Sequence, residues 1–223
     1  FWRQRWESSN IGFHKSEANP LMVNYFGKLS LSKGSRVFVP LCGKTRDMAW
    51  FLSEGYRVAG AEWVEMAVEQ LFDELGVEPT ISKIGELKLY RAQDIDIFVG
   101  NIFDVSRSIL GSVDAIYDRA ALVALPNDMR QAYTAHLMEL TENAPQFLVT
   151  YEYDPALMQG PPFSVSQEEV HRHYREKYDV SLIVSEDVSG GLKGNAAQEN
   201  VWLLQKKYEE LDSRSDKGTQ RHH

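Results

Sequence analysis

The chain has 223 residues, a length typical of one α/β domain, and we expect a single domain over residues 1–207 followed by a polar tail, 208–223, part of which we take to be non-native. Its 32 Asp and Glu side chains outnumber 24 Lys and Arg, and the net charge of −8 argues against a nucleic-acid partner. With 43% hydrophobic residues, the composition excludes a chain that is disordered over most of its length.

Membrane and metal partners are not expected either. No apolar run approaches the roughly 20 residues that cross a bilayer, so we predict a soluble, cytoplasmic protein. Cys42 is the only cysteine, which leaves no disulfide framework and no cysteine-based zinc cluster. The internal histidines form no H-E-x-x-H pair, so we predict no metal site. We also expect a monomer.

The first third of the chain alternates between predicted helices and strands. Leu21 to Leu29 has apolar residues at helical spacing and belongs to an N-terminal helical extension. Apolar, β-branched runs at Arg36 to Cys42 and Arg57 to Trp63 predict two buried parallel strands. Helices are expected at residues 45–54 and 64–75, each followed by a glycine suited to ending a helix.

The rest of the chain continues this alternation and then changes to a strand pair. We expect Asn127 to cap a helix, and Ser166 with Glu169 to form a capping box. The other predicted strands and helices lie at residues 88–91, 95–99, 113–117, 127–142, 146–153, 180–188 and 200–206. These elements predict an α/β fold with an open, mostly parallel sheet of about seven strands, an antiparallel C-terminal edge and helices on both faces.

Ligands of such sheets bind outside the carboxyl ends of the strands, so the loops there are the place for a site. The turn at Gly43 follows the first strand, and it has neither the G-x-G-x-x-G spacing of a dinucleotide fold nor a P-loop. Glu62 closes the second strand, where an acid can accept hydrogen bonds from ribose hydroxyls. Turn and acid together indicate an adenosine-type ligand, although a strand-end Glu can also be a solvated terminus or an ion-pair partner.

Seven short motifs between Phe1 and about Lys207 carry a family resemblance. They are F-W-x-x-R-W at 1–6, I-G-F-H at 11–14, V-P-L-C-G-K at 39–44, G-A-E-W at 60–63, N-I-F-D at 101–104, D-R-A-A-L at 118–122 and G-P-P-F at 160–163. In this order they resemble the thiopurine S-methyltransferase family, in its shorter, bacterial type. The resemblance implies a Rossmann-like class I methyltransferase fold, with S-adenosyl-L-methionine as cofactor and S-adenosyl-L-homocysteine as product.

The resemblance also implies a cofactor site drawn from several loops. Its residues would be Trp6, Leu41, Glu62, Ile102, Phe103 and Arg119. Glu62 would hold the ribose, and Ile102 with Phe103 would pack against the adenine edge. Packing alternatives stay open, since Trp6 can pair with Trp2 on one helical face and Leu41 can be a core residue.

A sulfonium already activates the methyl group, so the reaction needs alignment with a soft nucleophile more than a strong base. Arg119 is the expected cation near the acceptor sulfur, where it would favour the thiolate, and Asp118 is expected to orient it. Arg119 could instead pair structurally with Asp118, Asp114 or an exposed acid. His14 is a weaker candidate for a general base, with a packed, hydrogen-bonded histidine as the alternative.

The acceptor pocket is expected under a cover that excludes water. We predict that the extension, residues 1–32, covers the active site with Phe13, and that Pro161, Pro162 and Phe163 complete the cover. Lys193 is a second, weaker candidate for a cation near the acceptor. The link at 190–195 is shorter than in animal members of the family, so their acceptor contacts cannot be transferred to it.

The acceptor itself is left open by the residues. The resemblance implies thiopurines or other small aromatic and heterocyclic thiols, and, for the bacterial type, detoxification of selenium or tellurium oxyanions such as tellurite. A related small-molecule methyltransferase acting on a halide, thiocyanate or a metalloid is the alternative. A protein that keeps the fold and binds a nucleotide without catalysis is a third hypothesis.

Overall fold

The computed structural model describes residues 18–42 and 46–207. Predictions on residues 1–17, 43–45 and 208–223, among them the covering part of the extension and the turn at Gly43, lie outside the described residues. The architecture below is that of the two described ranges.

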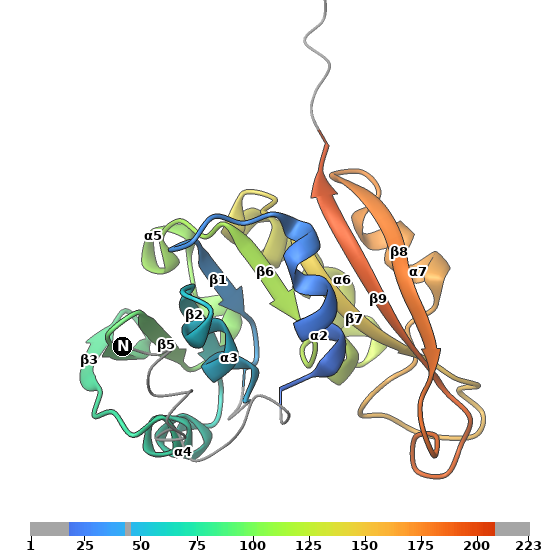
Figure 1. Cartoon of the computed structure of the whole chain (residues 1–223), viewed down its shortest axis with the longest axis horizontal. Helices are drawn as coiled ribbons and strands as arrows, with labels where there is room; N and C mark the ends of the chain where they lie inside the picture. Colours follow the sequence, from blue (N-terminus) through green and yellow to red (C-terminus); the bar gives the residue numbers. More distant parts are fainter. Residues whose placement is uncertain (1–17, 43–45, 208–223) are drawn as a thin grey trace, which may run out of the picture.

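The described residues form one nine-stranded sheet (Figure 1). Its strands are β1 (Arg36–Val39), β2 (Arg57–Glu62), β3 (Thr80–Ile84), β4 (Leu87–Ala92), β5 (Ile95–Val99), β6 (Ala115–Asp118), β7 (Gln146–Glu152), β8 (Tyr178–Asp187) and β9 (Gln198–Lys206). They lie in the order β3-β4-β5-β2-β1-β6-β7-β9-β8. The central strands from β5 to β7 run parallel, and the strands beyond them on both sides pair antiparallel.

Helices cover both faces of this sheet. They are α2 (Pro20–Tyr25), α3 (Asp47–Ser53), α4 (Glu65–Leu75), α5 (Arg107–Leu110), α6 (Asn127–Thr141) and α7 (Gln167–Tyr174), with 3-10 turns η2 (Phe26–Leu29), η3 (Ile102–Asp104) and η4 (Leu122–Ala124). Buried side chains of α2, α3 and α4 pack on one face, and those of α5, α6 and α7 pack on the other. The sheet is therefore the middle of three layers.

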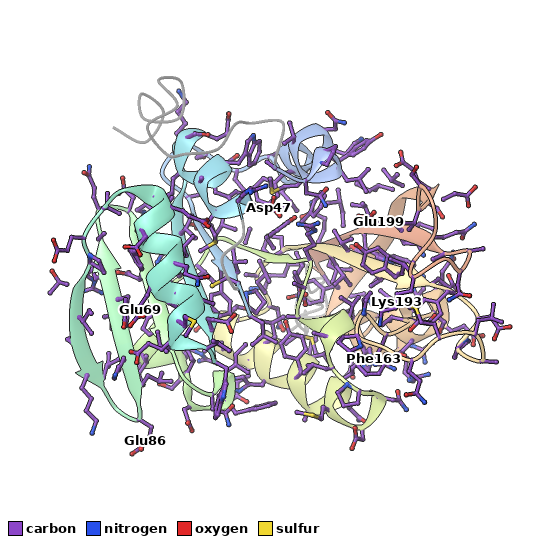
Figure 2. All side chains as sticks on the ribbon, turned by 90° about the horizontal axis from the view of Figure 1, so that it is seen from below. Asp47, Glu69, Glu86, Phe163, Lys193 and Glu199 are labelled. Atoms are coloured by element: carbon purple, nitrogen blue, oxygen red, sulfur yellow. The ribbon has the colours of Figure 1, made fainter. Side chains whose placement is uncertain are left out.

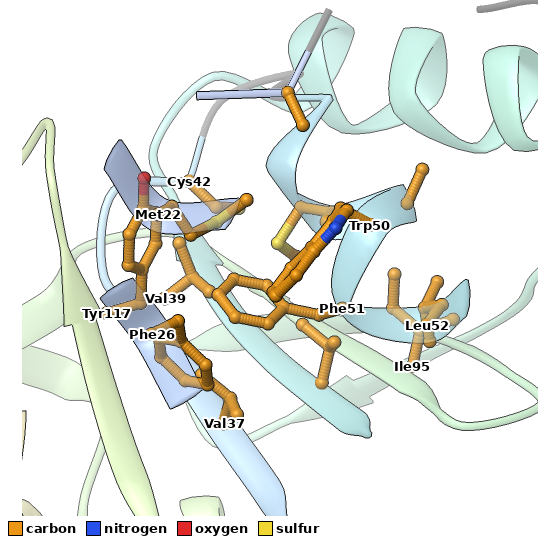
Figure 3. Close-up of a cluster of buried hydrophobic side chains, with 14 of the residues drawn as sticks. Met22, Phe26, Val37, Val39, Cys42, Trp50, Phe51, Leu52, Ile95 and Tyr117 are labelled. Atoms are coloured by element: carbon orange, nitrogen blue, oxygen red, sulfur yellow. The ribbon is translucent and has the colours of Figure 1, made fainter. Parts of the chain in front are cut away.

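Side-chain alternation along the strands separates the two cores. In β1, Val37 and Val39 belong to the core under α2 and α3, whereas Phe38 belongs to the core under α6. Figure 3 shows the first core, in which the rings of Phe26 and Phe51 meet edge to face with their centroids 4.8 Å apart. Burial on both faces explains why these strands read as continuous apolar runs.

The sequence prediction of an α/β fold with a mostly parallel sheet is confirmed. The number of strands differs from the predicted number. The sheet has nine strands instead of about seven, and β3, the one strand that no predicted range covers, adds an antiparallel edge beside β4. The side chains of β3 are exposed or half-buried along its whole length, so it shows no alternation of apolar and polar residues. A strand of this kind gives no sequence signal of period two.

The helix caps confirm Ser166 as a cap and correct two other predictions. The Glu169 side chain does not complete a capping box with Ser166, because its carboxylate accepts from Arg130 Nη2 at 3.1 Å and bonds a ring nitrogen of His173 at 2.8 Å. The Ser166 hydroxyl accepts from the backbone N–H of Glu169 at 3.1 Å, so Ser166 is the N-cap of α7. Asn127, however, is the first residue of α6 and not its cap, since Pro126 occupies the cap position. The Asn127 side chain instead accepts from Arg130 Nη2 at 3.2 Å. A side chain one position inside the helix points away from the first-turn amides that it was expected to bind.

The chain reverses its direction across the sheet at β1. From β1 it adds β2 and later β5 on one side, and β6 and β7 on the other. The carboxyl ends of these five strands face the lower side of the molecule in Figure 1. Such a reversal opens the crevice in which open α/β sheets bind their ligands. None of the helices in the described ranges is long and apolar enough to cross a membrane.

Candidate active site

The first loop at this edge is a tight turn that follows β1. Leu41 has a left-handed backbone, with φ 48°, and the next amide, that of Cys42, donates to the carbonyl of Ala61 at 2.9 Å. This bond holds the turn against the end of β2. A residue with a branched or bulky side chain is strained at positive φ, so the backbone of Leu41 is held by its surroundings.

Close packing beneath this turn requires a glycine in β2. A Cβ added to Gly60 would lie 2.9 Å from Cys42 Sγ and 2.8 Å from Ile97 Cδ1. Burial raises the pKa of the Cys42 thiol, so the group stays protonated at neutral pH. Cys42 is therefore a packing residue of this loop and not a nucleophile.

Glu62 stands at the carboxyl end of β2, as expected from sequence. It is the last residue of the strand and lies opposite Val99 of β5. Its Oε1 accepts the backbone N–H of Val64 at 3.1 Å, which fixes the carboxylate in the turn before α4.

The loop after β5 presents an aromatic ring. Ile102 is buried, whereas Phe103 is 40% exposed and lies beside His136, with ring centroids 5.2 Å apart. The Asn101 side chain accepts from the amide of Phe103 at 3.0 Å, and a ring nitrogen of His136 bonds the carbonyl of Ile102 at 2.9 Å. Both ends of this turn are thus fixed, and the Phe103 ring is partly exposed.

Arg119 follows the last residue of β6, and its partner differs from the expected one. Its Nη1 pairs with Asp47 Oδ2 at 3.3 Å. The carboxylate of Asp118 points into the other core, where it accepts from Tyr133 Oη at 2.8 Å and from the amides of the η4 turn. Successive residues of a strand face opposite sides of a sheet, so neighbours in sequence cannot both reach the same face. The expected role of Asp118 in orienting Arg119 is corrected in this way.

The burial of Asp118 leads to a prediction on pH. Burial raises the pKa of Asp118 from 3.8 to about 6, although hydrogen bonds from Tyr133 and the η4 amides lower it in part. A raised folded-state pKa stabilises the fold below the unfolded value, near pH 4, and this contribution is lost as the pH rises through about 6. The free energy of unfolding should fall by at most about 3 kcal/mol across that interval.

The variant Asp118→Asn tests this prediction, because its side chain does not ionise. Urea unfolding of both proteins at a series of pH values between 4 and 7 gives the difference in stability. The wild type should lose stability relative to the variant as the pH rises. A difference that stays constant over this range would contradict the raised pKa of Asp118.

Two further groups approach Arg119 from the neighbouring strands. Tyr151 of β7 lies directly opposite Glu199 of β9 in the strand register. Burial lowers the pKa of Arg119, and the surrounding oxygens, first Tyr117 and Asp47 and then Tyr151 and Glu199, raise it by more. Burial raises the pKa of Glu199, and the charge of Arg119 opposes that rise. Arg119 is thus the cation of a small, mixed cluster of polar groups.

The loop after β7 lies beside the turn that follows Arg119. The amide of Phe163 donates to the carbonyl of Val123 at 2.7 Å, and Tyr153 Oη donates to the carbonyl of Pro162 at 2.8 Å. Pro162 and Phe163 are half-buried, whereas Pro161 is exposed. The first bond attaches the predicted covering loop to the η4 turn, and the second joins the end of the loop to its beginning.

Lys193 occupies the link between β8 and β9 and is exposed, with φ 47°. Figure 2 views the molecule from the edge at which the parallel strands end, and it shows Asp47 next to α2 and α3. Glu199, Lys193 and Phe163 lie on the β8–β9 side in the same view.

Some residues of the predicted site are placed by the structure and others are not. Leu41, Glu62, Ile102, Phe103 and Arg119 all lie at the carboxyl edge of the central strands. Trp6, Phe13 and His14 lie outside the described residues. Within the described ranges there is no group of three or more His, Cys, Asp or Glu side chains that could hold a metal ion.

Sequence reasoning did not identify Asp47, Tyr151 or Glu199. Asp47 is the first residue of α3, and an acid at that position reads as an ordinary favourable residue of a helix N-terminus. Tyr151 and Glu199 come from strands far apart in the chain. Only the register of β7 with β9 brings them together, and a single sequence does not carry that register.

Comparisons with known proteins agree on one family. A sequence model described as "Thiopurine S-methyltransferase (TPMT)" matches residues 1–209. Two proteins named thiopurine S-methyltransferase are among the similar ones. That of Xanthobacter autotrophicus is 53% identical over 92% of this chain and 98% of its own length, and that of Gluconobacter oxydans is 46% identical over 91% and 92%.

Solved structures resemble this one in fold at low identity. A methyltransferase from Methanosarcina mazei matches with a TM-score of 0.63 and 15% identity, over 86% of this chain and all of its own. The 1,6-didemethyltoxoflavin-N1-methyltransferase of Burkholderia thailandensis, solved with S-adenosylhomocysteine, matches with a TM-score of 0.56 and 15% identity, over 92% and 85%. These likenesses agree with the predicted Rossmann-like, class I methyltransferase fold.

Proposed function

This chain belongs to the thiopurine S-methyltransferase family and is a methyltransferase dependent on S-adenosyl-L-methionine, and on that premise we propose that it methylates small aromatic or heterocyclic thiols, thiopurines among them, on sulfur. The observation that carries the proposal is the position of Arg119. Its guanidinium is anchored on one side by a buried acid, and its side chain is 40% exposed at the end of β6. A fixed cation at this edge favours an acceptor that reacts as an anion.

The residues of the neighbouring loops fit the cofactor by their chemistry. Glu62 supplies acceptor oxygens for the ribose diol, and Ile102 with Phe103 supplies an apolar edge for adenine. The turn at Leu41 brings backbone rather than a long side chain to the crevice. When bound, S-adenosyl-L-methionine supplies a methyl group activated by a sulfonium, and it leaves as S-adenosyl-L-homocysteine.

The chain's own contribution is alignment and electrostatics. Arg119 favours the thiolate form of the acceptor, because a nearby cation lowers the pKa of a thiol. The thiol proton passes to solvent, the methyl carbon forms its bond to the acceptor sulfur, and its bond to the sulfonium sulfur breaks. No residue then needs to act as a strong base, and His14 is proposed at most as a secondary one.

The acceptor is proposed to lie between Arg119 and the loop of Pro161, Pro162 and Phe163. The bonds of that loop to Val123 and Tyr153 support its role as a fixed wall. Water exclusion would strengthen the interaction of Arg119 with the thiolate. We keep as proposals a contribution of Lys193, contacts of Trp6 and Phe13, coverage by residues 1–32, and a monomeric protein.

The proposal is tested by binding and by turnover with competing acceptors. Calorimetry should show that S-adenosyl-L-methionine and S-adenosyl-L-homocysteine both bind. A thiopurine should yield an S-methylated product, identified by mass, whereas iodide, thiocyanate and tellurite should react more slowly. Faster methylation of iodide or of tellurite would move the acceptor to the alternative class. Absence of binding to both cofactor forms would contradict the proposed function altogether.

A further inference from the structure

We propose that Asp47 is the positioning residue of the acceptor site, acting through Arg119. The inference rests on the proposed function, because it concerns the cation that faces the acceptor thiolate. Asp47 lies on α3, whereas Arg119 lies at the end of β6, and the two side chains meet at 3.3 Å. Asp47 would not touch the acceptor. It would act by holding the Arg119 guanidinium in the orientation that faces the acceptor.

Asp47 is itself fixed from two other elements. Its Oδ1 accepts the backbone N–H of Asn19 at 2.9 Å, and its Oδ2 accepts from Tyr117 Oη at 2.8 Å. Asn19 is the N-cap of α2, where its side chain accepts from the amides of Leu21 and Met22. The carboxylate is therefore tied to α2 and to β6 before it meets Arg119.

The burial of the pair is unequal, and this separates it from a structural ion pair. Arg130 and Glu169 join α6 to α7, and their side chains are 6% and 9% exposed. In contrast, the Asp47 side chain is 2% exposed while that of Arg119 is 40% exposed. A buried acid alone is costly for the fold. Asp47 holds one terminal nitrogen of the Arg119 guanidinium, while the Arg119 side chain stays partly exposed.

Anchoring matters because an arginine side chain has many rotamers. The side chain of an arginine has about 2 kcal/mol of rotamer entropy. Without an anchor, binding of the thiolate would have to offset the loss of that entropy. A charge-assisted hydrogen bond to a rigid carboxylate removes part of that freedom before the acceptor arrives. Tyr151 of β7 and Glu199 of β9 also interact electrostatically with Arg119 and raise its pKa.

The variant Asp47→Asn tests the proposal, since it keeps the shape and removes the charge. We expect kcat/KM for a thiopurine to fall about 10- to 30-fold, which corresponds to about 1.4–2 kcal/mol. The Kd for S-adenosyl-L-homocysteine, measured by calorimetry, should stay within about twofold. A thermal melt shows that the compared proteins are folded.

A double-mutant cycle with Arg119→Ala distinguishes positioning from a purely structural role. If Asp47 acts through Arg119, the variant with both replacements should be no slower than Arg119→Ala alone. A full additional loss in the Arg119→Ala background would overturn the proposal, as would an unchanged kcat/KM in Asp47→Asn. Failure of the wild type to methylate any thiol would instead contradict the proposed function, and so the two failures are distinguishable.

A second variant and a matched control complete the test. Tyr117→Phe removes the other hydrogen bond to Asp47 Oδ2 and should lower kcat/KM about threefold, again only while Arg119 is present. It keeps the proposal testable if Asp47→Asn does not fold. Asp96→Asn is the control, because Asp96 forms an ion pair with Arg36 at the opposite ends of the strands. Its kinetics should match the wild type, and an equal loss there would overturn the proposal.

Discussion

Replacing Arg119 with alanine should lower kcat/KM for a thiol acceptor by about 10²- to 10³-fold, or about 3–4 kcal/mol. The variant loses the cation that favours the thiolate, while Asp47 and Tyr117 stay in place beneath it. The Kd of S-adenosyl-L-homocysteine should change far less, within about fivefold. Initial rates at varied acceptor concentration and calorimetry give the two numbers.

The pH dependence of this loss provides an internal control. If Arg119 lowers the pKa of the acceptor thiol, as proposed, the defect of Arg119→Ala should shrink above the pKa that the thiol has in water. Arg119→Lys should show an intermediate loss, because a lysine keeps the charge without the planar fork that reaches Asp47. A defect of equal size at all pH values would mean that Arg119 serves the architecture of the site and not the ionisation of the acceptor.

The positions of several candidate site residues could be predicted from the sequence, because these residues lie at the ends of strongly apolar strands. Glu62 ends a run that is buried on both faces, so its place at the carboxyl edge follows from the end of the run. Arg119 was likewise expected at this edge, after β6. An apolar run of this kind predicts which residues lie at the carboxyl edge of the sheet.

Partners across the sheet were not predictable in the same way. Asp118 was the nearest acid in sequence and was expected to orient Arg119, yet strand alternation sends it to the core under α6. Asp47, 72 positions from Arg119, takes that place because α3 packs over the end of β6. Such pairings depend on how a helix sits on a sheet, which one sequence does not reveal.

The edge strand β3 was missed for a related reason. Its side chains are exposed or half-buried, so no burial pattern marks it, and its pairing with β4 rests on backbone hydrogen bonds. The central strands were found because both faces are buried. For β3, prediction failed because neither burial nor a run of β-branched residues marks the strand.

Replacing Glu62 with alanine should raise the Kd of S-adenosyl-L-methionine by about 10²- to 10³-fold, or about 3–4 kcal/mol. The reason is the loss of two charge-assisted hydrogen bonds to the ribose, each worth about 1.5–3 kcal/mol. At saturating cofactor kcat should recover, because the proposed role of Glu62 is to hold the ribose and not the reacting groups. Glu62→Gln should fall between wild type and alanine, since the amide keeps one acceptor oxygen.

A cofactor analogue shows whether Glu62 acts on the hydroxyls. The 2′-deoxy form of S-adenosyl-L-homocysteine should bind the wild type at least about 10-fold more weakly than the parent compound, and should bind Glu62→Ala no more weakly than the parent does. If Glu62 binds the ribose as proposed, the hydroxyl has this partner only while the carboxylate at the end of β2 is present. Equal discrimination by both proteins would place the ribose elsewhere and leave Glu62 as the residue that fixes the turn at Val64.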